Sequence, residues 1–171
     1  MKSLRTLALL PLAAAAAQAY TIELQLGENR PTGYKNGTVV GLNIAGQVGQ
    51  NVSLGLNLSD QNIEDTASTY NVKARNASFD IVYELNPRGA IHPYIGAGIG
   101  YAWLSDTEAF TKSKSVMTSS ALAGIRFELS RDVDIAFNVR NTQLHSVSNL
   151  AGTSKNAIKL WESTVGLRFK F

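Results

Sequence analysis

The sequence predicts an all-β fold, an eight-stranded antiparallel up-and-down transmembrane β-barrel. Apolar and polar residues alternate in eight segments after residue 19, and this is the period of β-strands. The same region has no uninterrupted apolar run of the roughly 20 residues that a membrane-spanning helix needs. Longer polar connections also alternate with short ones along the chain, as they do in barrels that cross a membrane.

Residues 1–19 have the features of a cleaved signal peptide. Lys2 and Arg5 precede an apolar stretch, and a small-x-small sequence ends at Ala19. A membrane anchor is the alternative, but the apolar stretch is shorter than a spanning helix requires. We therefore expect an exported protein with a single domain, a barrel over residues 20–171.

The composition excludes several classes of site. The chain has no cysteine, so it can form neither a disulfide nor a cysteine metal site. Its two histidines lie far apart in the sequence, which disfavours a metal centre. The formal net charge of +3 falls to +1 once Lys2 and Arg5 leave with the signal peptide, so the barrel has no strongly basic character. We expect no metal, no other cofactor and no nucleic-acid partner.

Each alternating segment places an apolar row on one face of its strand. The clearest case is 52–59, where valine and leucine alternate strictly with serine, glycine and asparagine. In the segment 91–104, glycines occupy every second position from Gly96 to Gly100, which leaves room inside a narrow barrel. The predicted strands are 20–26, 40–46, 52–59, 77–85, 91–104, 121–129, 133–140 and a last one, around Val165, that runs to Phe171.

The lengths of the connections predict which end of the barrel faces the cell exterior. Longer loops of such barrels are extracellular, whereas the short turns are periplasmic. The expected loops are 27–37, 60–73, 105–113 and 145–156, and the expected turns are 46–51, 86–90 and 130–132. An even number of strands also returns both termini to the periplasmic side. All the loops are short, which argues mildly against a dedicated adhesin.

A water-soluble β-sandwich or lipocalin-like barrel would show the same alternation. Periodicity does not say which face of the strands is inside. The glycine row in 91–104, the aromatic residues near strand ends and the aromatic C-terminal residue favour lipid around the barrel. On this interpretation, the apolar rows face lipid and the polar rows face the lumen.

The polar rows contain charged residues, which we expect to form a network inside the barrel. An unpaired charge in the interior would be costly, and residues of opposite charge are abundant on these rows. The predicted members are Glu23, Asp80, Glu84, Arg126, Glu128, Arg140 and Arg168. A barrel of about eight strands is just wide enough for side chains to fill it, so we expect a structural role. A narrow, gated path for water or ions is the alternative.

Two stretches resemble the small Gram-negative outer-membrane barrels of the OmpA/OmpX type. They are His92 to Tyr101 and the C-terminal stretch Val165 to Phe171. The resemblance implies a place in the outer membrane, among outer-membrane lipid and lipopolysaccharide. It also implies that the alternating residues Leu167, Phe169 and Phe171 are an assembly signal, read by the barrel-assembly machinery.

An enzyme remains an alternative, because eight-stranded outer-membrane barrels include lipid A deacylases and acyltransferases. The stretch His145 to Asn149 is similar to the His-x-Ser element of the deacylases, and His145 continues the row expected to face lipid. The match is incomplete, because Val147 stands where that element has serine and because Glu162 is expected inside the barrel. His92, beside a proline, is expected at a turn. We therefore expect no catalytic residues.

The sequence as a whole predicts an integral outer-membrane protein with a structural, envelope-integrity or surface-interaction role and no catalytic activity. Host or environmental surface ligands are the partners that the exposed loops could bind. The alternatives are a lipid A-modifying enzyme of the deacylase kind and a small gated channel.

Overall fold

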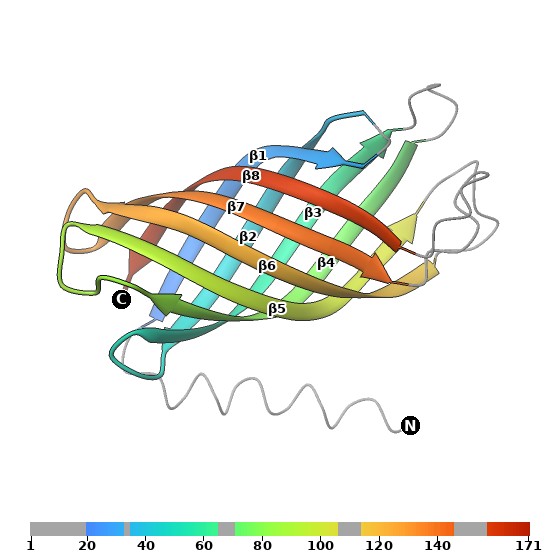
Figure 1. Ribbon diagram of the computed structural model, residues 1–171. Coiled ribbons are helices and arrows are strands. Elements are labelled where there is room, and N and C mark those ends of the chain that lie inside the picture. The colour runs from blue at the N-terminus through green and yellow to red at the C-terminus, as the bar shows by residue number, and fades with distance from the viewer. Residues whose placement is uncertain (1–19, 33–34, 65–70, 106–113, 146–156) are drawn as a thin grey trace.

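The computed structural model describes residues 20–171 except 33–34, 65–70, 106–113 and 146–156. The predicted signal peptide, residues 1–19, lies outside this part, as do most of the predicted loops 105–113 and 145–156. The described residues form eight strands (Figure 1). They are β1 (Tyr20–Pro31), β2 (Gly37–Gln47), β3 (Val52–Glu64), β4 (Asn71–Glu84), β5 (Ile91–Ser105), β6 (Lys114–Glu128), β7 (Val133–His145) and β8 (Ala157–Lys170).

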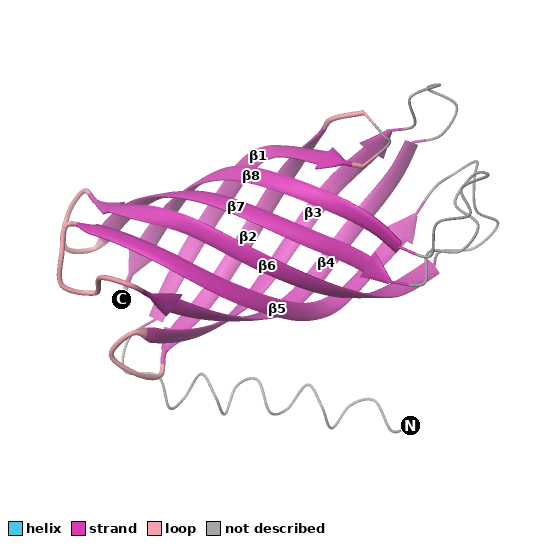
Figure 2. Cartoon of the chain, in the orientation of Figure 1, coloured by secondary structure: helices cyan, strands magenta, loops and turns pink. Residues whose placement is uncertain are grey.

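The strands form a closed antiparallel barrel. Each strand pairs with its neighbours in the sequence, and β1 closes the barrel by pairing with β8. The backbone N–H of Phe171 donates to the carbonyl of Tyr20 at 2.9 Å, so the closure reaches the last residue. The short turns and the C-terminus lie together at one end, drawn at the left in Figure 2, which we call the turn end; the opposite end is the loop end. This arrangement confirms the predicted up-and-down barrel.

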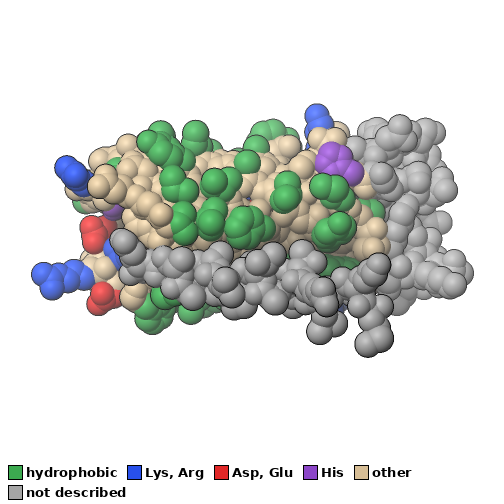
Figure 3. Space-filling model, turned by 90° about the horizontal axis from the view of Figure 1, so that it is seen from below, with side chains coloured by type: hydrophobic (Ala, Val, Ile, Leu, Met, Phe, Trp, Pro, Cys, Tyr) green, Lys and Arg blue, Asp and Glu red, His purple; other side chains and the backbone are tan. Residues whose placement is uncertain are grey.

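The outer wall carries an apolar band along its middle. On β1 the outward row is apolar from Tyr20 to Leu26, and on β7 it includes Phe137 and Val139. Figure 3 shows hydrophobic side chains gathered over the middle of the wall and charged ones toward its ends. Exposed aromatic residues lie toward both edges of the band: Tyr20, Tyr83 and Phe171 toward the turn end, and Tyr101, Trp103 and Trp161 toward the loop end. Such aromatic girdles are typical of barrels at membrane interfaces.

In the described part of the chain, no helix has both the length and the apolar character to cross a membrane.

The strands extend further toward the loop end than the sequence predicts. The described parts of the predicted loops 27–37 and 60–73 are largely strand, because β1 continues to Pro31 and because β3 and β4 stay paired to their ends. The same extension lengthens β6 and β7. The prediction was wrong there because the outward row turns polar above the apolar band. Asp60 and Arg75, for example, lie opposite each other in a continuous ladder although both are charged.

The inner face is polar over most of its length and apolar at the loop end. Buried polar side chains such as Asp80 and Gln61 fill the middle of the lumen. At the loop end, buried apolar side chains from β3 to β8 form a cluster, which we call the apolar cap. Its members are Ile63, Ala74, Ala102, Leu104, Val116, Leu144, Ile158 and Leu160. The two faces of the wall therefore exchange polarity along the strands, as expected where a barrel leaves the hydrocarbon and is surrounded by water.

We expect Leu104→Ala to lower the free energy of unfolding by about 2–5 kcal/mol, because Leu104 is only 1% exposed and its loss leaves a cavity in the apolar cap. Urea unfolding of the barrel in detergent micelles measures the change. Met117→Ala is the control, because Met117 is 51% exposed on the outer wall and detergent can cover the space that it leaves. Equal losses in the two variants would show that the cap does not stabilise the barrel.

Candidate functional site

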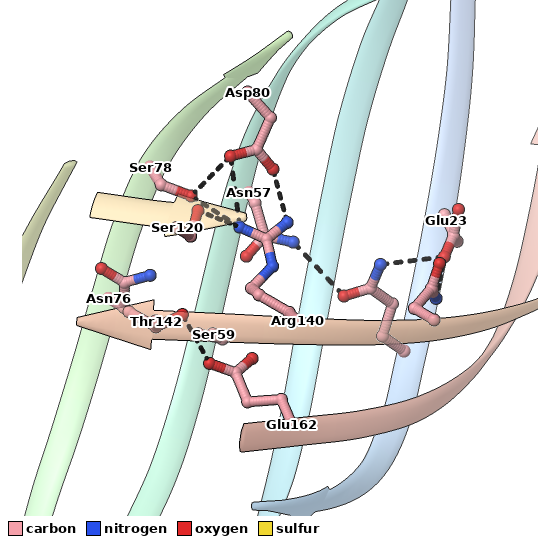
Figure 4. Close-up of polar contacts among 12 residues, drawn as sticks. Glu23, Asn57, Ser59, Asn76, Ser78, Asp80, Ser120, Arg140, Thr142 and Glu162 are labelled. Atoms are coloured by element: carbon pink, nitrogen blue, oxygen red, sulfur yellow. Dashed lines mark hydrogen bonds and ion pairs between the residues drawn. The ribbon is translucent and has the colours of Figure 1, made fainter. Parts of the chain in front are cut away.

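The centre of the lumen is a buried ion pair between β4 and β7. Arg140 contacts the carboxylate of Asp80, which is 1% exposed, with an Nη1 to Oδ1 distance of 3.2 Å. The same Nη1 donates to the hydroxyl oxygens of Ser78 and Ser120 at 3.3 and 3.2 Å (Figure 4). Ser78 also donates to Asp80 at 3.0 Å. The guanidinium of Arg140 on β7 therefore contacts acceptors on both β4 and β6.

A glycine makes room for this pair. A Cβ at Gly98, which lies opposite Asp80 on β5, would collide with the Asp80 carboxylate and would lie 2.8 Å from Ser120 Oγ. Gly124 of β6 makes room for the Tyr94 ring in the same way, because a Cβ at Gly124 would overlap the Tyr94 hydroxyl. The room inside the barrel that the glycine row predicts is filled by charged and aromatic side chains.

Hydrogen bonds between side chains fill the lumen on the loop side of the ion pair. Glu162 accepts a hydrogen bond from Thr142 at 2.9 Å. Further toward the loop end, Asn29 donates to Gln61 at 3.2 Å, and Thr118 donates to Asn76 at 3.1 Å. These side chains lie below the apolar cap and link β1, β3, β4 and β6 across the lumen.

On the turn side of the ion pair, the charges form a second group. The carboxylate of Glu23 accepts from Asn138 at 2.9 Å and from Gln25 at 2.8 Å. Arg126 lies over the ring of Tyr94, 4.0 Å from its centroid, and donates to Glu84 at 3.3 Å. A cation over an aromatic face is a favourable contact when it is shielded from water.

The turn-end mouth holds a third group. Lys170 lies 2.8 Å from Asp134 and 3.2 Å from Glu128, and Arg168 lies 3.9 Å from Asp134. His92, expected at a turn, lies near this mouth, where its Nδ1 contacts the backbone carbonyl of Asn86 at 2.9 Å. A carbonyl only accepts, so Nδ1 carries the proton.

The charged residues predicted to form one network are thus divided among separate groups, all on the inward rows. Glu23, Asp80, Arg126 and Arg140 are buried, whereas the side chains of Glu84 and Arg168 are partly exposed. Glu128 lies at the rim of the mouth, where its side chain is 38% exposed. Asp134, Glu162 and Lys170 join these groups from the same inward rows, although the predicted set did not include them.

The filled lumen leaves little space for solvent. A void of about 40 Å³ lies among Glu23, Tyr94, Arg126, Arg140 and Glu162. Because one water molecule needs about 10–15 Å³ of such space, the void holds only a few water molecules. Both members of the ion pair, Asp80 and Arg140, lie in its lining. The described part of the barrel is a packed interior rather than a pore.

The outer wall has a second charged surface, above the apolar band at the loop end, which we call the collar. The cations of the collar are Arg30, Lys73, Arg75 and Lys159, and its anions are Glu28 and Asp60. Arg75 pairs with Asp60 at 3.3 Å and Arg30 with Glu28 at 3.7 Å, and all four side chains are more than half exposed. Among the described side chains, Lys73 and Lys159 have no carboxylate partner, so the six residues of the collar together have a net charge of +2.

A serine and a histidine also meet on the outer wall beside the collar. His145 lies on the outward row of β7, and its Nε2 is 2.8 Å from Oγ of Ser119 on β6. Ser119 was not among the predicted residues, because the His-x-Ser pattern concerns only serines that follow His145 in the chain. The strand register, which brings residues 26 apart in sequence together, was the missing information.

The predicted assembly signal lies on the outward row at the closing strand. Leu167 is 41% and Phe171 75% exposed, and Phe169 is partly exposed between them. Recognition by the assembly machinery remains a prediction. In the described ranges, no group of three or more His, Cys, Asp or Glu side chains is arranged to hold a metal ion.

Comparison with known proteins identifies the family to which the chain belongs. The model of the outer membrane protein β-barrel domain matches residues 3–171. No curated protein matches the chain in sequence.

Solved structures show the same fold at low sequence identity. Neisserial surface protein A is 15% identical, with a TM-score of 0.73 over 90% of this chain and 96% of that one. The N-terminal β-barrel domain of Pseudomonas aeruginosa OprF is 16% identical, with a TM-score of 0.62 over 91% of this chain and 98% of that one. The outer membrane enzyme PagL is 17% identical, with a TM-score of 0.52 over 85% of this chain and 97% of that one. The fold therefore occurs in an enzyme as well as in surface proteins.

Proposed function

Because the chain belongs to the family of outer-membrane protein β-barrel domains and lies in the outer membrane, we propose that it is a sealed barrel with a structural role in the outer leaflet. The fold alone does not decide between this role and catalysis, since the enzyme PagL shares it. The proposal therefore depends on the lumen and the collar of this chain.

The packed lumen is the observation that carries the proposal. A channel needs a continuous hydrated path, with charges that line water rather than contact each other. Here Arg140 and Asp80 bind each other across the middle of the lumen, and the apolar cap follows on the loop side. Both features argue against the gated-channel alternative.

The collar gives the barrel a means of holding the outer leaflet. Its height, directly above the apolar band, is the height at which lipid headgroups meet the wall. Lipopolysaccharide carries phosphates there, and lysine and arginine bind phosphate by charge-assisted hydrogen bonds. Lys73 and Lys159 lie on opposite sides of the barrel, on β4 and β8, so the collar can engage several lipid molecules at once.

We expect the double variant Lys73→Gln, Lys159→Gln to retain lipopolysaccharide roughly tenfold or more less tightly, because each basic residue near an anionic membrane surface contributes about 1 kcal/mol. Binding of lipopolysaccharide to the purified barrel in micelles, titrated at low and high salt, measures the change. Lys170→Gln is the matched control, because Lys170 lies at the turn end and pairs with Asp134.

If Lys170→Gln weakens binding as much as the collar variant does, the collar is not the binding surface. Binding that is insensitive to salt would also contradict the proposal, since contacts between exposed charges are screened. Surface ligands bound through the loops remain an expectation from the sequence, because most of the loop residues lie outside the described ranges.

A further inference from the structure

Ser119 and His145 have the geometry of an activated serine on the outside of the barrel. Ser119 Oγ lies 2.8 Å from His145 Nε2, which is hydrogen-bonding distance. When the imidazole carries its proton on Nδ1, Nε2 accepts the hydroxyl proton of the serine. A hydroxyl held against a neutral imidazole nitrogen is the arrangement by which a base activates a serine nucleophile.

The pair lies outside the lumen. Thr118 and Leu144, which are paired with each other on β6 and β7, are both 1% exposed and point inward. Ser119 and His145 follow them on the opposite face and are partly exposed. A substrate would therefore reach the pair from the surrounding membrane, without entering the packed interior.

The height of the pair on the wall selects a class of substrate. On β6 the outward row is Ala123, Ala121 and then Ser119, so Ser119 is the first polar residue of this row toward the loop end, with Met117 beyond it. On β7 the outward residues change from Val139 to asparagine, glutamine and His145 at the same level. Membrane lipids have their ester linkages at this boundary, between the acyl chains and the headgroups.

The neighbouring outward positions supply groups that could hold such an ester. Gln143 lies directly opposite Ser119, and its carboxamide is a hydrogen-bond donor of the kind that stabilises a developing oxyanion. Lys159 of β8 lies opposite Gln143 and brings a cation beside the pair. Among the described residues, the outward rows of β6, β7 and β8 contain no carboxylate, so the serine and histidine form a dyad there.

We propose that Ser119 and His145 form an esterase dyad that hydrolyses carboxylic esters of outer-leaflet lipids. Ser119 Oγ bonds to the ester carbonyl carbon while His145 Nε2 takes the hydroxyl proton. The C–O bond to the lipid alcohol then breaks, and the alcohol leaves with that proton. Water attacks the acyl-Ser119 ester in the same way, with His145 again as base, and releases the fatty acid and the free serine. This activity is independent of the proposed structural role and departs from the expectation of a barrel without catalysis.

The test uses the folded barrel in octyl glucoside, a detergent without ester bonds. A long-chain alkyl fluorophosphonate should label the wild-type protein on Ser119, as peptide mass spectrometry would show, with loss of fluoride. Hydrolysis of p-nitrophenyl laurate should be lost in Ser119→Ala and should fall by about 10²–10⁴-fold in His145→Gln, the usual share of a general base. Ser163→Ala is the matched control, because Ser163 is an exposed outward serine of β8, and it should keep full activity.

Heat-dependent gel mobility establishes that every variant is folded before it is assayed. Vesicles of phosphatidylethanolamine and purified lipopolysaccharide then distinguish the source of the ester. Fatty acid released from either lipid, and lost in Ser119→Ala, supports the proposal and identifies the substrate. Release from neither overturns the assignment of lipid esters. An unlabelled Ser119 in the folded wild-type barrel, or equal rates in wild type and Ser119→Ala, overturns the dyad itself.

Discussion

Replacing Asp80 by alanine is expected to lower the free energy of unfolding of the barrel by about 3–5 kcal/mol, the usual cost of leaving a buried charge without its partner. Asp80 is 1% exposed, and its carboxylate is bound by Arg140 from the opposite wall of the lumen. Ser78 and Ser120 can still accept hydrogen bonds from the guanidinium, but neither carries a negative charge, and Glu162, opposite Arg140 on β8, is bound by Thr142. Urea unfolding in micelles, followed by tryptophan fluorescence, measures the loss.

Two further variants compare the stability contributed by the buried ion pair with that of an exposed one. Asp60→Ala removes the carboxylate that pairs with Arg75 on the collar, where both side chains are more than half exposed, and should cost only about 0–1 kcal/mol. Replacing both members of the buried pair, Asp80→Leu with Arg140→Met, should recover much of the stability that Asp80→Ala loses. A cost for Asp80→Ala no greater than that for Asp60→Ala would contradict the role given to the lumen pair.

Phe171→Gln is expected to remove most of the assembled barrel from the outer membrane, whereas Lys170→Gln leaves most of it in place. Phe171 ends the outward aromatic row and is 75% exposed, where a partner protein can reach it. Lys170 points to the turn-end mouth and contacts Asp134 and Glu128. The heat-modifiable band in outer-membrane fractions measures the amount of folded barrel in each strain.

Refolding of the same variants from urea into micelles is the control. Both should refold alike, because the effect of Phe171 concerns assembly in the cell rather than the stability of the barrel. If Phe171→Gln fails to refold, its low amount in the outer membrane reflects a less stable barrel instead. Equal losses for the two variants in cells would contradict the assembly signal.

The strand rows within the apolar band were predictable from sequence, because one face meets lipid and the other meets a packed polar interior. Leu54 and Leu56 of β3 therefore alternate with small or polar residues, and their period is visible without a structure. The inward placement of Glu23 and Arg140 follows from the same alternation. Strand ends were not predictable in the same way. Above the band, inward residues such as Ile63 are apolar and outward ones such as Asp60 are polar, so the polarity that marks the two faces reverses.

Contacts across the barrel depend on register and closure, which alternation does not contain. Arg140 and Asp80 are 60 residues apart and lie on strands that do not pair, so no local pattern connects them. Glu23 and Asn138, 115 residues apart, meet only because β1 closes the barrel against β8. The contact between Ser119 and His145 depends in the same way on the pairing of β6 with β7. Sequence reasoning identified the face of each residue, but not its partner.

Ion conductance tests the central claim, that the lumen is sealed, most directly. The purified barrel, inserted into planar bilayers in concentrated KCl, should give no stable unitary current steps, because the Asp80–Arg140 pair and the apolar cap close the path. Heat-modifiable mobility of the same preparation shows that the protein is folded. Reproducible current steps from the folded barrel would contradict the account and would favour the gated channel.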